Sequence, residues 1–356
     1  MIRLKVCLWE DLRFERERDV RASNTSVRSG WLLPEPVMHP VATAGGGALL
    51  LAVFLAAVAL PLATYTTALA MFGLAHVGSE LRYVDHRFGG RLRGGLAVAL
   101  GCGLAGTLVV RVLAMAGWLP YGGAIVLELT IVAAMTASTF VSMRRFRGAA
   151  AAVAALLFGC AVIAPVPTFL FLAVAHNLTP LAFLADALKG AERRRTLAIM
   201  AVPFIALPLL IATGLPHALL AQAGLVAPEA TMFSAGTLAD NLGAYVPAAW
   251  LDAPWAVNVF SAAVFAQCMH YAVVIFVLPR LIDRNARRQT ILRWPNAVTF
   301  VGVMAALALA FVVGFSIDYS VARKLYALAA LVHGWIEIPI LVLALDRAGV
   351  RPAAAG

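Results

Sequence analysis

The chain has 356 residues, of which 62% are hydrophobic and 13% are charged. This composition excludes an ordinary soluble globular domain, and the apolar runs approach the 20 or so residues that a helix needs to cross a bilayer. The net charge of +10 does not indicate nucleic-acid binding, because the basic residues cluster between apolar runs, as in the cytoplasmic loops of membrane proteins. We therefore predict an all-α, polytopic integral membrane protein.

The N-terminal segment is polar, and we expect no cleavable signal peptide in it, since no apolar run follows its basic residues directly. We predict that residues 1–40 form a mobile, basic cytoplasmic tail. Met38 directly precedes the first apolar run, so it is an alternative start to Met1.

Apolar runs separated by proline, glycine and charged residues predict about ten transmembrane helices within a domain at residues 41–346. The predicted helices are 42–60, 63–84, 94–118, 121–143, 148–164, 167–187, 196–214, 255–279, 296–316 and 324–345. Residues 215–254 are predicted to form an extracytoplasmic loop, and residues 347–356 a cytoplasmic tail.

The distribution of basic residues predicts the orientation. With both termini inside, 25 of the 28 lysines and arginines fall in inner segments. Arg111 lies within a predicted helix, and Arg323 and Lys324 fall outside the membrane. This bias is what the positive-inside rule requires. It predicts a multi-pass protein of the cell inner membrane.

Four histidines lie singly on four predicted helices that all run from outside to inside. Each is followed by a basic inner boundary at a rise of about 9 to 21 Å, so the four rings can share one layer. A lone membrane histidine is more often a packing residue, but four that can converge indicate a metal site, because imidazole is the commonest protein metal ligand. The candidate ligands are His76, His176, His270 and His333.

Two glutamates lie four residues after a candidate ligand, Glu80 after His76 and Glu337 after His333. Residues at this spacing share a helix face, and a ligating histidine usually donates its second N–H to a carboxylate or carbonyl. We therefore predict that both glutamates orient the rings or bind the metal themselves. Glu80 is close enough to the inner interface that it equally suits a carboxylate reaching towards the head groups.

Arg111 and Glu128 lie on consecutive predicted helices joined by a tight turn. Each is seven residues from that turn's aromatic boundary, at Trp118 and Tyr121, so both charges lie about 10 Å below the outer surface. An isolated charge at this depth is costly. We predict a structural ion pair between them.

A four-histidine site with carboxylates around it suits iron(II) in a non-haem oxygenase. The clustered histidine boxes of membrane desaturases and the zinc motif HExxH are both absent. A haem held by two histidines and a proton-coupled transporter with histidine relays remain alternative interpretations.

Three segments carry a resemblance to a known family. FGLAHVGSELRYVD, FLFLAVAHNLTP and CMHYAVVIFVLPR resemble motifs of the Brp/Blh family, membrane enzymes that cleave β-carotene with dioxygen to make retinal. The chain departs from that pattern at Ala75, where the family has proline, at Val77, where it has glycine, and at Pro180, where it has a second histidine. The resemblance covers these short motifs and implies a membrane iron oxygenase, with carotenoid as a possible substrate.

The functional prediction is an integral-membrane, non-haem iron(II), dioxygen-dependent oxygenase. It would act as a dioxygenase-like enzyme on a lipophilic small molecule that enters from the lipid bilayer. His76, His176, His270 and His333 would bind Fe(2+), and carotenoid cleavage to retinal is the suggested reaction.

Overall fold

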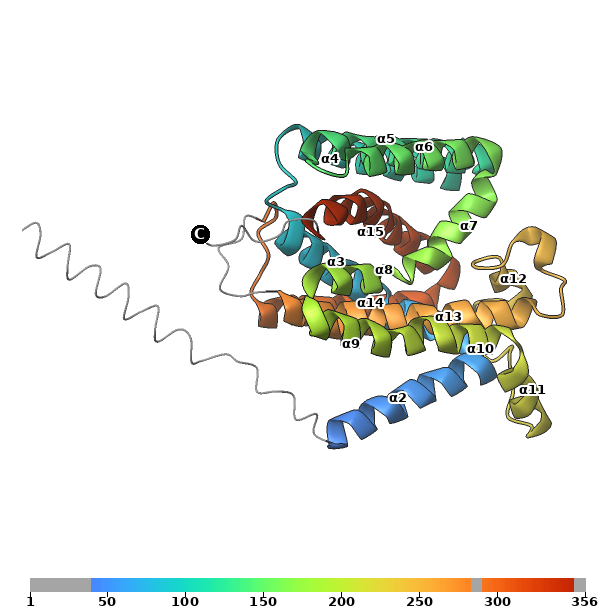
Figure 1. Ribbon diagram of the computed structural model, residues 1–356. Coiled ribbons are helices and arrows are strands. Elements are labelled where there is room, and N and C mark those ends of the chain that lie inside the picture. Colours follow the sequence, from blue (N-terminus) through green and yellow to red (C-terminus); the bar gives the residue numbers. More distant parts are fainter. Residues whose placement is uncertain (1–39, 283–289, 349–356) are drawn as a thin grey trace, which may run out of the picture. The chain divides into compact units, whose positions relative to one another are not determined.

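The computed structural model describes residues 40–282 and 290–348, all of them in helices or their connections, with no strand (Figure 1). Contacts divide the chain into two units, residues 1–51 and 52–356. The described part of the first unit is the beginning of one helix, and the second unit holds all other elements. The predicted tail at 1–40 and the alternative start at Met38 lie almost wholly outside the described residues, as does nearly all of the tail at 347–356.

The helices follow one another with short connections. Their bounds are α2 Pro40–Ala59, α3 Pro61–Phe88, α4 Gly95–Met115, α5 Tyr121–Ser138, α6 Arg147–Ile163, α7 Pro165–His176, α8 Thr179–Ala187, α9 Gly190–Ala201, α10 Leu207–Ala212, α11 Leu215–Gln222, α12 Leu238–Leu242, α13 Ala256–Ala272, α14 Ala297–Ile317 and α15 Tyr319–Ala348.

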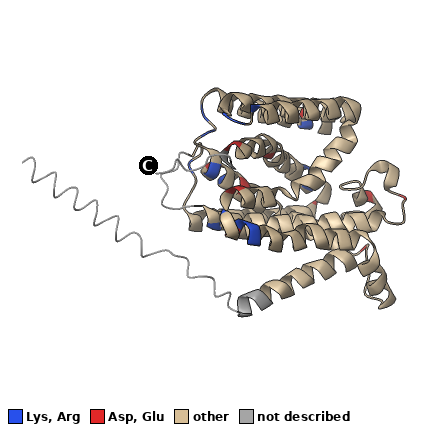
Figure 2. Cartoon of the chain, in the orientation of Figure 1, with Lys and Arg blue, Asp and Glu red and all other residues tan. Residues whose placement is uncertain are grey.

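Six helical stretches in the described residues are long and apolar enough to cross a membrane, or seven if the bent pair α7–α8 is one span. The six are α4, α5 with its 3-10 extension, α9–α10, α13 with its extension, α14 and α15. Figure 2 shows that most of their length carries no charged residue. The chain is therefore a multi-pass membrane protein by the length and composition of its helices.

The sequence predicts ten crossings, and the three that the structure does not support as apolar spans correspond to α2, α3 and α6. Both α2, over Gly45–Ala59, and α6 are apolar but short. By contrast α3 has 28 residues, enough to cross, but polar side chains such as His76, Glu80 and Asp85 are among its buried residues. It is an interior helix whose polar face is covered by protein.

The predicted helix at 167–187 is wrong as a single rod. It is divided into two helices, α7 and α8, with an angle of 48° between their axes. Pro180 lies in the first turn of α8, where it has no N–H to donate to the carbonyl of His176, so α7 cannot continue through it as a regular helix. The bend comes directly after His176, so this histidine is the last residue of α7.

The core of the second unit is built around α3 and α15. Within it, α3 packs against α13, α14 and α15, while α15 also contacts α4 and α5. Figure 1 shows α4, α5 and α6 on one side of α15, with α13 and α14 on the other. This arrangement brings helices from both halves of the chain to one centre.

The predicted extracytoplasmic segment 215–254 contains α11 and α12 and is not a featureless loop. Thr237 caps α12: its hydroxyl accepts from the Asp240 backbone N–H, and Asp240 accepts from the Thr237 backbone N–H. The side-chain amide of Asn241 donates to the carbonyls of Ala235 and Thr237, at 2.8 and 2.9 Å. These bonds fix the position of the Asn241 side-chain oxygen, which faces the beginning of α15.

A candidate metal centre of four histidines

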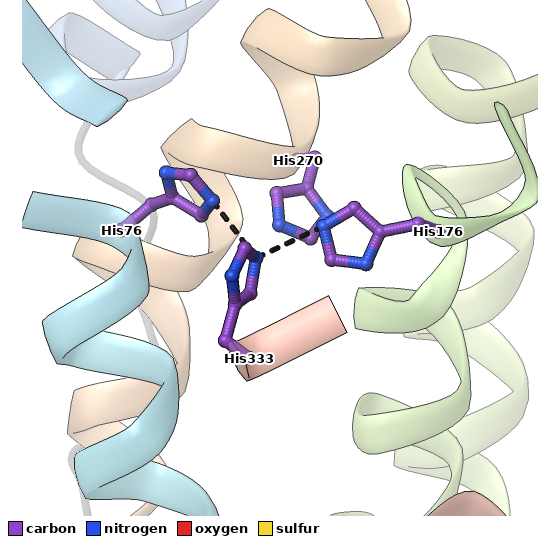
Figure 3. Close-up of side chains that lie close together, drawn as sticks. All are labelled: His76, His176, His270 and His333. Atoms are coloured by element: carbon purple, nitrogen blue, oxygen red, sulfur yellow. Dashed lines mark hydrogen bonds between the residues drawn. The ribbon is translucent and has the colours of Figure 1, made fainter. Parts of the chain in front are cut away.

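The four candidate ligands meet in the interior of the second unit. They come from α3 (His76), α7 (His176), α13 (His270) and α15 (His333), and their rings point towards one another (Figure 3). One ligand atom from each lies within 4.8 Å of the ligand atoms of the other three. The four histidines converge, as the sequence predicts, and the cluster could hold a metal ion.

The measured separations suit a single ion. His333 Nε2 is 3.1 Å from His76 Nε2 and 3.1 Å from His176 Nε2. Metal–imidazole bonds of about 2.1 Å place ligand nitrogens about 3.4 Å apart in a tetrahedron. Small movements of the rings would therefore bring all four nitrogens to bonding distance of one ion.

The outward nitrogens fix which ring atom faces the centre. His76 Nδ1–H donates to the Phe72 carbonyl at 3.3 Å, and His176 Nδ1–H donates to Glu337 Oε2 at 2.5 Å. In a neutral imidazole the other nitrogen then carries a lone pair. His76 and His176 thus each aim an Nε2 lone pair at His333 Nε2, which carries at most one hydrogen and cannot satisfy both. A cation at the centre resolves this conflict.

The surroundings of His270 also favour a cation at the centre of the cluster. Its side chain is 0% exposed, and neither ring nitrogen has a hydrogen-bond partner. Burying such a polar group without a partner is costly. Glu80 Oε2 approaches its Nε2 at 3.5 Å, and the carboxylate of Glu80 is also buried without a hydrogen bond. Both groups have the donor chemistry of a metal ligand.

The two glutamates contact histidines on other helices. The sequence places Glu337 below His333 and Glu80 below His76 on the same helix. In the structure Glu337 holds His176 of α7, and Glu80 approaches His270 of α13. The spacing of four residues puts each carboxylate one turn below its own histidine, beside the neighbouring helix. Thr179 adds a hydrogen bond to Glu337 Oε1 at 2.8 Å, a contact that the sequence did not indicate.

A polar network beside the cluster was also missed. The Tyr271 ring stacks on His76 with centroids 4.0 Å apart and 23° between the planes. Its hydroxyl accepts from Gln267 Nε2 at 2.6 Å and lies 2.8 Å from the Tyr326 hydroxyl. Gln267 in turn accepts from Tyr245 at 2.9 Å. Gln267 and Tyr271 are four apart in an apolar helix, a spacing that could have revealed the pair.

The cluster opens into a cavity of about 540 Å³. Three of the histidines, His76, His176 and His333, line it together with Glu337. The rest of its wall is mostly apolar and aromatic, with side chains such as Phe169 and Leu172 of α7 and Leu331 and Ile338 of α15. A mostly apolar cavity with a few convergent polar groups is the usual form of a small-molecule site.

Arg111 and Glu128 form the ion pair that the sequence predicts. Arg111 Nη2 donates to Glu128 Oε2 at 2.6 Å, and the Glu128 side chain is fully buried. Arg111 also lies over the Phe169 ring, 5.2 Å from its centroid. The pair links α4 to α5 at the edge of the cavity, and its arginine has a partner already.

No family model, no curated protein and no solved structure that was compared with this chain matches it.

Proposed function

We propose that the protein is an integral-membrane, non-haem iron(II), dioxygen-dependent oxygenase that acts on a lipophilic small molecule. The observation that carries the proposal is the meeting of four buried imidazoles on the wall of an apolar cavity. Imidazole suits iron, copper, nickel and zinc alike. A site that combines all-histidine ligands, flanking carboxylates and a lipophilic cavity favours iron and oxidation chemistry.

In this proposal His76, His176, His270 and His333 hold the iron, and Glu80 completes or flanks the ligand set. Iron bound there would activate dioxygen. Glu337, fixed by Thr179, keeps His176 in the tautomer whose Nε2 faces the ion, as carboxylates do for metal-bound histidines generally. The stacked ring of Tyr271 holds the plane of His76. The apolar wall binds the substrate and excludes water from the reacting carbon.

The spacing of the rings favours a single ion over haem. A haem with two histidine ligands needs one imidazole on each face of the macrocycle. With all four ligand atoms within 4.8 Å, the other two imidazoles would occupy the space of the porphyrin itself.

The membrane arrangement is part of the same proposal. Both termini lie on the cytoplasmic side of the cell inner membrane, a placement that 25 of the 28 basic residues support through the positive-inside rule. With α2, α3, α6 and the bent pair counted, the chain crosses ten times. The substrate then enters laterally from the bilayer.

Carotenoid cleavage to retinal is the first reaction to test, because the segments around His76, His176 and His270 resemble those of the Brp/Blh family. Expression in cells that accumulate β-carotene would bleach them and produce retinal. A His333→Ala variant expressed at the same level should leave the pigment intact. Unchanged pigment with the unaltered protein would remove β-carotene as substrate without removing the metal centre.

Metal analysis tests the proposal directly. Protein purified in mild detergent and reconstituted without oxygen should hold one iron per chain, and alanine at any one of the four histidines should lower the content strongly. His217 lies in α11, outside the cluster, so His217→Ala is a matched control that should bind iron normally. Fewer than about 0.2 iron atoms per chain in the unaltered protein would contradict the proposal.

A further inference from the structure

Arg323 is an unneutralised cation in the wall of the cavity that holds the histidines. In the described residues, ion pairs of lysine and arginine with carboxylates join Arg87 to Asp186, Arg91 to Asp346 and Arg111 to Glu128, and none includes Arg323. A partly buried guanidinium without a carboxylate is costly. This cost points to an anion that the cavity receives from outside the chain.

The hydrogen-bond partners of Arg323 are neutral side chains, and they leave part of its hydrogen-bonding capacity free. Its Nη1 donates to Asn241 Oδ1 at 3.3 Å, and its guanidinium lies 5.9 Å from the centre of the Tyr65 ring. Asn241 Oδ1 is shared, since Tyr319 also donates to it at 3.3 Å. A guanidinium has five N–H donors in a fork that matches a carboxylate or phosphate. The bonds to Asn241 and to the Tyr65 hydroxyl hold the fork in place and leave its other N–H groups for an anion.

The cavity runs along one face of α15 from this cation to the metal centre. Arg323, Tyr326, Ala330, His333, Glu337 and Leu341 all line it, at the spacings of three and four residues that mark one helix face. Ten residues separate Arg323 from His333, which corresponds to about 15 Å along the axis. Arg323 lies in the second turn of α15, near the membrane boundary. The cavity therefore has a cationic end and, about 15 Å deeper, the candidate ion site.

The two ends of the cavity differ in chemistry. Around Arg323 the wall includes the hydroxyl-bearing residues Tyr65 and Tyr245, which can donate to the same anion. Towards the histidines it includes Phe169, Leu172 and other apolar side chains beside the network of Gln267, Tyr271 and Tyr326, whose polar groups already bond to one another. A molecule that satisfies both ends has a polar head and an apolar body.

We propose that the cavity takes a single-chain amphiphile with an anionic head group, which Arg323 binds while the apolar chain extends towards the four histidines. That the bound molecule is the substrate rests on the proposed function; that it binds does not. A pure hydrocarbon such as β-carotene would leave Arg323 without a partner. A carboxylic acid with an isoprenoid or alkyl chain would neutralise it. The oxidised carbon would lie in the middle of the chain, remote from the head.

The test measures binding to metal-free protein in neutral-lipid nanodiscs, so that no activity is needed. The probe is cis-parinaric acid, a fluorescent polyene acid, and its methyl ester is the uncharged match. Trp335 lines the cavity, so energy transfer from tryptophan reports a bound polyene. We expect the acid to bind about 10- to 100-fold more tightly than the ester, as one charged hydrogen-bonding contact implies. Equal affinities of acid and ester in the unaltered protein would overturn the proposal.

Three variants locate the effect. Arg323→Gln should abolish the preference for the acid, and Arg323→Lys should retain part of it. Lys324 is the next residue of α15 and is exposed, so Lys324→Gln removes the same charge from the same turn and should leave the preference intact. A preference that survives Arg323→Gln, or that is lost equally with Lys324→Gln, would contradict an Arg323 site.

Competition separates the sources of the anion. Displacement of the probe by a single-chain alkyl phosphate identifies a lipid-phosphate head group, and displacement by a fatty acid alone identifies a carboxylate. Either result supports the anionic class, whereas displacement by neutral alkanes to the same extent contradicts it. If iron fails to bind but the acid preference persists, the oxygenase proposal falls and the head-group site stands. If iron binds and the acid preference is absent, the head-group site falls and the oxygenase proposal stands.

Discussion

The Glu337–His176 contact allows a quantitative test of how the centre is held. Glu337 is 1% exposed, accepts from His176 Nδ1 at 2.5 Å and accepts from Thr179 at 2.8 Å. Glu337→Gln keeps the size and one acceptor but removes the charge. A hydrogen bond to a charged group contributes about 1 to 1.5 kcal/mol more than a neutral one. We therefore expect metal affinity to fall about five- to tenfold.

Removing the whole side chain should cost more. Glu337→Ala frees His176 to rotate and leaves its Nδ1–H without an acceptor, so the affinity should fall about 10- to 100-fold, as for other groups that orient metal-bound histidines. Thr179→Val removes the second bond but keeps the charge, and should lower affinity only about two- to threefold. Anaerobic titration with cobalt(II), followed by its visible absorption, measures all three. Unchanged affinity in Glu337→Ala would refute the orienting role of this carboxylate.

Three further predictions concern stability. Glu128→Gln should lower the free energy of unfolding by about 3 to 5 kcal/mol, because it leaves the largely buried Arg111 without its counter-charge. Thermal melting measures this loss, and a double substitution of both residues by apolar ones should recover part of it. Gly73→Ala should destabilise by about 1 to 3 kcal/mol, since its new Cβ would lie 2.7 Å from the Tyr326 ring. At Gly78 the neighbour is the flexible end of Met304, so Gly78→Ala is the matched control and should destabilise less. Equal melting temperatures for the two glycine variants would contradict this account. Adding iron at about 100 times its dissociation constant should stabilise the folded state by about 2.7 kcal/mol and raise the melting temperature. Chelation should reverse this rise. The absence of any rise would count against a metal centre.

The sequence predicted the four clustered histidines because a polar ring in an apolar helix is conspicuous. Pattern alone could not predict which carboxylate holds which histidine. The spacing of four residues correctly placed Glu80 and Glu337 on the histidine faces, but whether they contact their own helix or a neighbour depends on helix rotation and packing. The approach of Glu80 to His270 and of Glu337 to His176 is a tertiary property of that kind.

Helix ends explain the other differences. The last helix was predicted to begin at 324, which left Arg323 in an outer loop. Asp318 accepts from the Val321 backbone N–H at 2.9 Å, and this cap begins α15 at Tyr319. A capping residue was available in the sequence, but the apolar pattern begins after Lys324. Arg323 therefore lies within α15, where it lines the cavity. Similarly, Pro180 indicated the bend that divides α7 from α8, but the apolar run on both sides concealed it.

The order of synthesis follows from the place of α15 in the chain. Ribosomes make the three helices that carry His76, His176 and His270 first, and α15 then supplies His333. Until that helix inserts, the three earlier imidazoles lie among apolar neighbours without a full set of ligands around any ion. A metal at this cluster would therefore be loaded late, and a nascent chain that stops before Tyr319 would lack the fourth imidazole of the cluster.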